Sequence, residues 1–93
     1  MTNNDYELYV LIGSKWHFVE RCYTIKEVNI SINYIYEKYP DKAVQIIYND
    51  KEFYTLDGSD FQKFMFYNKY VLKQPEYFDY VKEYEKQKNF RKW

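Results

Sequence analysis

Histidine and cysteine, which supply many catalytic groups and metal ligands, each occur only once in this sequence. The lone cysteine, Cys22, excludes an intrachain disulfide and a multi-cysteine zinc site. The sequence also lacks a glycine-rich phosphate loop, a metal-type spacing of His, Cys and carboxylates, and a Gly-x-Ser-x-Gly motif. We therefore expect no catalytic centre, no metal site and no cofactor.

Long apolar runs are also missing, since none approaches the ~20 residues that cross a bilayer. The first residues, Met-Thr-Asn-Asn-Asp, lack the basic start and apolar stretch of a signal peptide. We expect a cytoplasmic protein that does not enter a membrane. A length of 93 residues suits one domain, and we predict a single domain over 1–93 that frays at residues 1–5 and about 89–93.

Charge of neither sign is in excess, because 14 basic residues balance 14 acidic ones. This balance argues against a highly acidic nucleic-acid mimic and against a generally basic nucleic-acid binder. Tyrosine, in contrast, occurs 13 times, and aromatic residues make up 24% of the chain. A tyrosine can stay exposed and still supply contact energy, because its ring is large and apolar while its tip is polar. The composition favours protein binding.

A central helix is predicted over residues 24–39. Thr24 and Glu27 form a capping box, in which each side chain satisfies a backbone N–H of the first turn. Pro40 ends the helix because it disfavours helical geometry in the residue before it. At about 100° per residue, one stripe collects the apolar positions Ile25, Val28, Ile32, Ile35, Tyr36 and Tyr39. We expect this stripe to cover a sheet.

A hairpin is predicted before this helix, from strands 6–12 and 16–23 around Gly13-Ser14-Lys15. With a three-residue loop, the core face carries Tyr6, Leu8, Val10, Ile12, Trp16, Phe18 and Cys22. The opposite face then carries Glu7, Tyr9, Leu11, His17, Val19, Arg21 and Tyr23. A two-residue loop would exchange the two faces of the second strand.

A second hairpin follows the helix, with strands 43–48 and 52–56 and a two-residue loop drawn from Asn49, Asp50 and Lys51. One of its faces carries Val44, Ile46, Tyr48, Phe53 and Thr55, and the other carries Ile47, Tyr54 and Leu56. Both hairpins are thus apolar on both faces. Such a sheet must be covered twice, by helices of the chain or by a partner, and a homodimer is compatible with this pattern.

Two further helices are predicted at the C-terminal end. Ser59 and Gln62 form a second capping box that opens a helix at 60–73, and Pro75 separates it from a helix at about 76–88. The element order is therefore ββαββαα. This order predicts an α+β domain in which an antiparallel sheet of two hairpins is packed by the central helix, with the two C-terminal helices completing or crossing it.

Our main functional hypothesis is a non-enzymatic protein-binding module. Ile30 and Tyr34 lie on the back of the central helix, where its own amphipathic pattern does not bury them. The predicted partner-binding residues are Ile30, Tyr34, Tyr9, His17, Arg21 and Tyr23. Lys, Asn, Ile, Tyr and Phe make up about half of the chain, as A/T-rich codons would produce. We therefore expect a phage or mobile-element protein that inhibits a larger host protein or complex, such as a defence system.

Two alternatives come from other classes of protein. A small nucleic-acid-binding protein would use the basic aromatic tail, with cations for phosphate and rings for base stacking. Its candidate residues are Lys86, Lys88, Phe90, Arg91, Lys92 and Trp93, together with the strand face that carries His17, Arg21 and Tyr23. A small nuclease or toxin would instead use His17 for acid–base chemistry beside Arg21 and Tyr9. In either case Cys22 is expected to be a small core residue.

Overall fold

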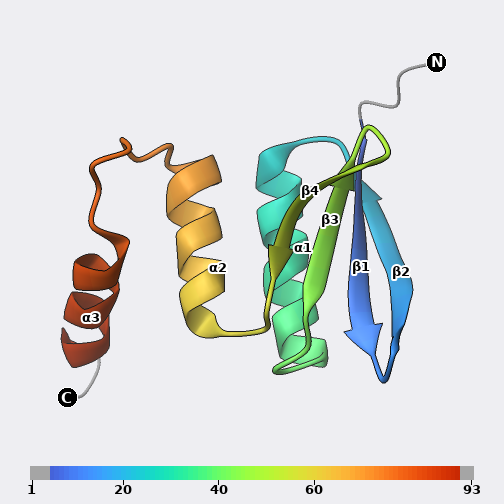
Figure 1. Cartoon of the computed structure of the whole chain (residues 1–93), viewed down its shortest axis with the longest axis horizontal. Coiled ribbons are helices and arrows are strands. Elements are labelled where there is room, and N and C mark those ends of the chain that lie inside the picture. Colours follow the sequence, from blue (N-terminus) through green and yellow to red (C-terminus); the bar gives the residue numbers. More distant parts are fainter. Residues whose placement is uncertain (1–4, 91–93) are drawn as a thin grey trace.

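The elements follow one another in the predicted order ββαββαα in a computed structural model that describes residues 5–90 (Figure 1). They are β1 (Tyr6–Ile12), β2 (Lys15–Cys22), α1 (Ile25–Lys38), β3 (Val44–Tyr48), β4 (Lys51–Leu56), α2 (Asp60–Phe66), its π-helical continuation η1 (Tyr67–Val71), and α3 (Tyr80–Phe90). The predicted helix at 60–73 is thus α2 together with η1. The last helix begins later than predicted because Asp79 caps it, accepting the N–H of Lys82 at 3.0 Å.

The four strands form one antiparallel sheet in the order β2-β1-β3-β4, so the predicted α+β class with two hairpins is confirmed. The hairpins meet along β1 and β3, where Leu8 lies opposite Ile46 and Val10 opposite Val44. These four side chains are at most 1% exposed. They face α1, and this side of the sheet is the core.

The first hairpin turns on a two-residue loop, so the predicted three-residue loop is wrong. Ile12 pairs with Lys15, and Gly13 takes a φ of 66° in the first loop position, where a type II′ turn calls for glycine. Trp16 and Phe18 therefore lie on the face away from α1, although the longer loop placed them in the core. They are 40% and 54% exposed.

A β-bulge restores the predicted facing in the second half of β2. The register shifts between Leu8 and Tyr9, which leaves Val19 as the extra residue of β2. Beyond it Cys22 pairs with Tyr6 on the core side and is 2% exposed, while Arg21 pairs with Glu7 on the other side. The prediction that Cys22 is a core residue is confirmed.

The second hairpin has its predicted two-residue loop, Asn49-Asp50, whose φ values of 53° and 62° fit a type I′ turn. A second bulge, at Phe53, reverses the faces of the rest of β4. Tyr54 therefore pairs with Ile46 on the core side, and Thr55 pairs with Gln45 on the opposite side. The predicted facing of Tyr54, Thr55 and Leu56 is wrong because alternation through the strand was assumed to be unbroken.

Helix α1 begins at its predicted cap. The Thr24 hydroxyl accepts the N–H of Glu27 at 3.1 Å, and the Glu27 carboxylate accepts the Thr24 hydroxyl and, at 3.3 Å, the N–H of Tyr23. The predicted stripe faces the sheet, with Val28, Ile32 and Ile35 fully buried. Each such aliphatic side chain contributes roughly 1.5–3 kcal/mol when it leaves water. This stripe is therefore the main source of packing energy.

Helices α2 and η1 pack on the same side of the sheet as α1. Phe66 is fully buried in the common core, and the rings of Phe66, Tyr54 and Tyr70 lie with their centroids 5.1 to 5.6 Å apart. Because Tyr54 faces the core, this contact places α2 and η1 beside α1 rather than across the other face. The C-terminal helices therefore do not give the sheet its second cover.

Helix α3 attaches to the body mainly through Tyr84. The Tyr84 ring lies 5.1 Å from the Phe61 centroid and 5.4 Å from the Phe64 centroid, both on α2. Val81, on the same helix, is 57% exposed, and Tyr77 in the preceding segment is 90% exposed. Figure 1 shows α3 at the end of the molecule farthest from β2.

Gly58 is the position where substitution should cost most stability among the glycines. Its φ is 92°, and a Cβ there would lie 2.7 Å from the carbonyl carbon of Asp41. We expect Gly58→Ala to lower the free energy of unfolding by about 2–4 kcal/mol, because backbone strain adds to a contact that cannot relax. Gly13→Ala is the control, since its φ is 66° but no heavy atom lies within 4 Å. Urea titration should show that Gly13→Ala loses only about 1–2 kcal/mol of unfolding free energy. Equal losses in the two variants would refute the contact between a residue-58 Cβ and Asp41.

Tyr84→Ala should release α3 from the body. An isolated helix of 11 residues is marginal in water, so we expect amide hydrogen exchange of 80–88 to become fast while the sheet stays protected. Tyr77→Ala removes the same ring from an exposed site and should leave the exchange of α3 unchanged. Unaltered protection of α3 in the Tyr84 variant would show that other contacts hold it.

Candidate protein-binding surface

The face of the sheet turned away from α1, here called the open face, has no helix over it within residues 5–90. Cross-strand pairing arranges its side chains in rows that run across the strands. The charged row consists of Arg21, Glu7, Ile47 and Glu52. The mixed row consists of Phe18, Tyr9, Gln45 and Thr55, and the apolar row of Trp16 and Leu11. Neighbouring rows are roughly 7 Å apart, the rise of two residues.

The charged row is held by ion pairs at one end and hydrogen bonds at the other. Arg21 reaches Glu7 at 3.0 Å and Asp5 at 3.6 Å. Glu52 accepts hydrogen bonds from Gln45 and Thr55, both at 2.9 Å, and these bonds hold its pKa below the usual value. The hydrogen bonds therefore favour the ionised form of Glu52 and hold its carboxylate in a fixed position.

The apolar and mixed rows form an aromatic surface at the other end of β1 and β2. The rings of Tyr9 and Phe18 meet edge to face at 5.6 Å, which fixes their orientation. Trp16 lies opposite Leu11 in the next row. Large exposed aromatics in fixed positions on a strand face are typical of protein interfaces, because little side-chain entropy is lost on contact.

Both edges of the sheet are irregular. The edge strand β2 carries the bulge at Val19, and the other edge strand, β4, carries the bulge at Phe53. A bulge interrupts the regular row of free N–H and C=O groups that an added strand would need. Contact through the open face is therefore better supported than extension of the sheet at an edge.

The structure brings together only part of the predicted partner-binding set. Tyr9 and Arg21 share the open face, as predicted. His17 pairs with Val10 and therefore lies on the opposite face, because the hairpin loop is one residue shorter than expected. The prediction that groups His17 with Tyr9 and Arg21 is wrong. Tyr23, at the connection to α1, is 65% exposed.

Ile30 and Tyr34 form a separate surface on the outer side of α1. They are 68% and 49% exposed, and Tyr34 accepts a hydrogen bond from Lys38 at 3.4 Å. Since α1 covers the core face of the sheet, this helix patch points away from the open face. A partner that occupies one of these surfaces does not reach the other without wrapping around the molecule.

The predicted nucleic-acid residues are divided as well. Lys86 and Lys88 lie on α3, where Lys86 is 3.9 Å from Glu83 and Lys88 sits over the Tyr84 ring. The side chain of Phe90 and the residues Arg91, Lys92 and Trp93 lie outside the part that the structure describes. Because α3 and β2 occupy opposite ends of the molecule (Figure 1), the lysines do not join the strand residues in one basic surface.

His17 and Cys22 give little support to a catalytic centre. The two residues share the helix side of β2, but their partners Val10 and Tyr6 are four positions apart on β1, about 13 Å along a strand. Burial raises the pKa of the Cys22 thiol to about 11, so at neutral pH it is neither a nucleophile nor a metal ligand. Residues 5–90 contain no group of three or more His, Cys, Asp or Glu placed to hold a metal ion.

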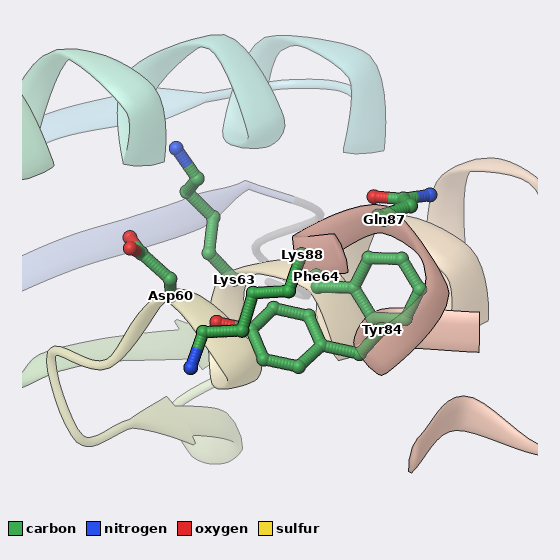
Figure 2. A pocket seen from close by; sticks show the side chains of 6 residues that line it. All are labelled: Asp60, Lys63, Phe64, Tyr84, Gln87 and Lys88. Carbon is green, nitrogen blue, oxygen red and sulfur yellow. The ribbon is translucent and has the colours of Figure 1, made fainter. Parts of the chain in front are cut away.

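The hollow between α2 and α3 is small, and its lining combines two aromatic rings with polar and charged side chains. It measures about 260 Å³ and is lined by Asp60, Lys63, Phe64, Tyr84, Gln87 and Lys88. Figure 2 shows the charged ends of its lining gathered to one side of the two rings. Within the described residues no buried side-chain nitrogen or oxygen lacks a hydrogen-bond partner, so the hollow contains no unsatisfied buried polar group that would call for a ligand. The hollow is better explained by the loose seating of α3.

Trp16, Phe18 and Leu11 are the surface residues that sequence reasoning missed. The first two were assigned to the core and Leu11 was left on a mixed face without a role. The signal that could have found them is the alternative two-residue loop at Gly13-Ser14, which turns both aromatic residues outward.

Comparison of this chain with protein-family models, with curated proteins and with solved structures found no significant match. Within residues 5–90, none of the helices combines the length and the hydrophobicity that crossing a membrane requires.

The raised pKa of Cys22 predicts a loss of stability at high pH. The folded thiol, with a pKa of about 11, holds its proton more tightly than the unfolded thiol at 9.0, so its contribution is complete below pH 9 and falls as the pH rises to 11. We expect the wild type to lose about 1–2 kcal/mol more than Cys22→Ala over this range, because two pKa units set an upper bound near 2.7 kcal/mol. Urea titrations at pH 8 and 10.5 measure the difference, and parallel losses would contradict it.

Proposed function

We propose that this chain is a non-enzymatic protein-binding module whose open face lies against a larger partner protein. The observation that supports the proposal is that Trp16 and Phe18 remain exposed beside the half-buried Tyr9 and Leu11, while the helices of residues 5–90 pack on the other face. A contiguous exposed apolar patch on a small protein is typical of an interaction site.

Trp16 and Phe18 are the two exposed aromatic side chains that would anchor this contact. Truncating an aromatic anchor at the centre of an interface often lowers the binding free energy by about 2 kcal/mol or more, which is about 30-fold in affinity. Here both rings already lie in fixed strand positions, and Tyr9 and Leu11 flank them without competing for the same space. The open face thus offers preorganised contact area, which reduces the ordering cost of binding.

The identity of the partner is a separate hypothesis. The expectation of a phage or mobile-element protein that inhibits a host machine, such as a defence system, depends on amino-acid composition and small size. It stays a prediction, as do the cytoplasmic location and the homodimer. The nucleic-acid hypothesis also stays a prediction, and binding to phosphates would weaken steeply with salt. An aromatic protein interface would respond far less.

Replacing both exposed rings, as Trp16→Thr with Phe18→Thr, should abolish partner binding without unfolding the chain. Threonine keeps the β-propensity of the strand, and the rings do not enter the core, so we expect circular dichroism and the melting temperature to change little. We expect affinity to fall at least about 100-fold, in line with two lost aromatic anchors. A tagged-chain pull-down from lysate treated with nuclease, followed by calorimetric titration of the retained protein, measures the loss.

The matched control is Ile30→Ser with Tyr34→Ser on the helix patch, which removes a similar apolar surface from the far side of the molecule. Its binding should equal that of the wild type. If the helix-patch variant loses binding and the strand variant keeps it, the partner surface is on α1. If only nucleic acid is retained, and is lost after nuclease, the protein-binding proposal fails.

A further inference from the structure

The charged row contains an acidic gap that a basic side chain would fill. Glu7 on β1 and Glu52 on β4 flank Ile47 on β3 in one register row. Strands in a sheet are about 4.8 Å apart, so the backbones of these two residues stand roughly 10 Å apart with the Ile47 side chain between them. This spacing suits one Lys or Arg whose aliphatic stem lies over Ile47 while its charged end meets the carboxylates.

Each of the two carboxylates has an oxygen to spare. Arg21 contacts Oε2 of Glu7, and both hydrogen bonds to Glu52 end on its Oε1. Among residues 5–90 no donor reaches Oε1 of Glu7 or Oε2 of Glu52. Arg21 pairs with Glu7 and Asp5, whereas Glu52, on the other edge strand, receives hydrogen bonds only from the uncharged side chains of Gln45 and Thr55 among residues 5–90.

A second copy of this chain does not complement the open face. Sheets that pack face to face keep their strands within about 30° of one another. If the corresponding strands of two copies ran in the same direction, placing the sheets face to face would reverse the strand order across the interface. Arg21 would then lie over Glu52 of the other copy, but Glu7 would lie over Ile47, inside the acidic gap. If they ran in opposite directions, the carboxylates would be buried against the apolar row without partners. A second copy therefore brings a carboxylate rather than a cation to the acidic gap.

We propose, on the basis of the protein-binding function above, that the partner presents an apolar or aromatic side chain flanked by a Lys or Arg. The apolar side chain meets Trp16 and Phe18, and the cation lies over Ile47 between Glu7 and Glu52. By row and strand spacing, Ile47 is roughly 12 Å from Phe18 and roughly 17 Å from Trp16. The shorter distance is close to the roughly 10.5 Å that separates positions i and i+7 of a helix. The apolar contact supplies affinity and the cation fixes register and orientation.

A displayed library of random 16-residue peptides tests this chemistry without knowledge of the natural partner. Selection on the wild type should enrich peptides that carry a Lys or Arg at a fixed distance from an aromatic or aliphatic residue. We expect the best peptide to bind Glu52→Lys at least about tenfold more weakly, and selection on that variant to lose the preference for basic residues. Glu85→Lys on α3 makes the same change in net charge at the far end of the molecule and should leave both unchanged.

The outcomes separate the two proposals. Peptides that lose binding to the Trp16→Thr, Phe18→Thr variant but show no basic preference would overturn the acidic-gap inference and leave the protein-binding function intact. Failure to select any peptide that depends on these two rings would overturn both. Light scattering adds a further check, because a dimer of the wild type that dissociates in the Trp16→Thr, Phe18→Thr variant would show that a second copy occupies the open face.

Discussion

The packing of α1 against one face of the sheet is the interaction on which the rest of the structure depends. Val28, Ile32 and Ile35 lose all contact with water there, against Leu8 and Val10 and their neighbours on β3. Phe66 of α2 is buried in the same core, beside Tyr54. Helix α2 therefore packs on the α1 side of the sheet and does not cover the open face. The outward aromatic side chains are what this choice leaves exposed.

The bulges decide which side chains take part in that choice. Strict alternation through β2 would put Cys22 and Arg21 on the wrong faces once the tight turn at Gly13 has turned Trp16 outward, and the extra residue at Val19 corrects the second half of the strand. One strand thereby supplies both a core thiol and an exposed aromatic surface. The same irregularity weakens the edge as a template for strand addition.

The open face combines two kinds of chemistry that suit protein recognition. Its aromatic end offers area that costs little entropy to use, and its charged end places carboxylates at set positions. The balanced charge of the whole chain gives no sign of the carboxylates that share this row. A surface that is apolar at one end and acidic at the other discriminates between partners better than a uniform apolar patch.

The sequence by itself determined the element order, both capping boxes and the α1 stripe, because each depends on local spacing and local hydrogen bonding. It also indicated that the strands were apolar on both faces. Only the tertiary structure decided which faces would be covered, because one loop residue or one bulge reverses every side chain beyond it. That reversal moved Trp16 and Phe18 onto the open face and His17 off it. Neither a two-residue loop nor a bulge is fixed by the residues of β2 alone, since both are selected by pairing with β1 and by what α1 can bury.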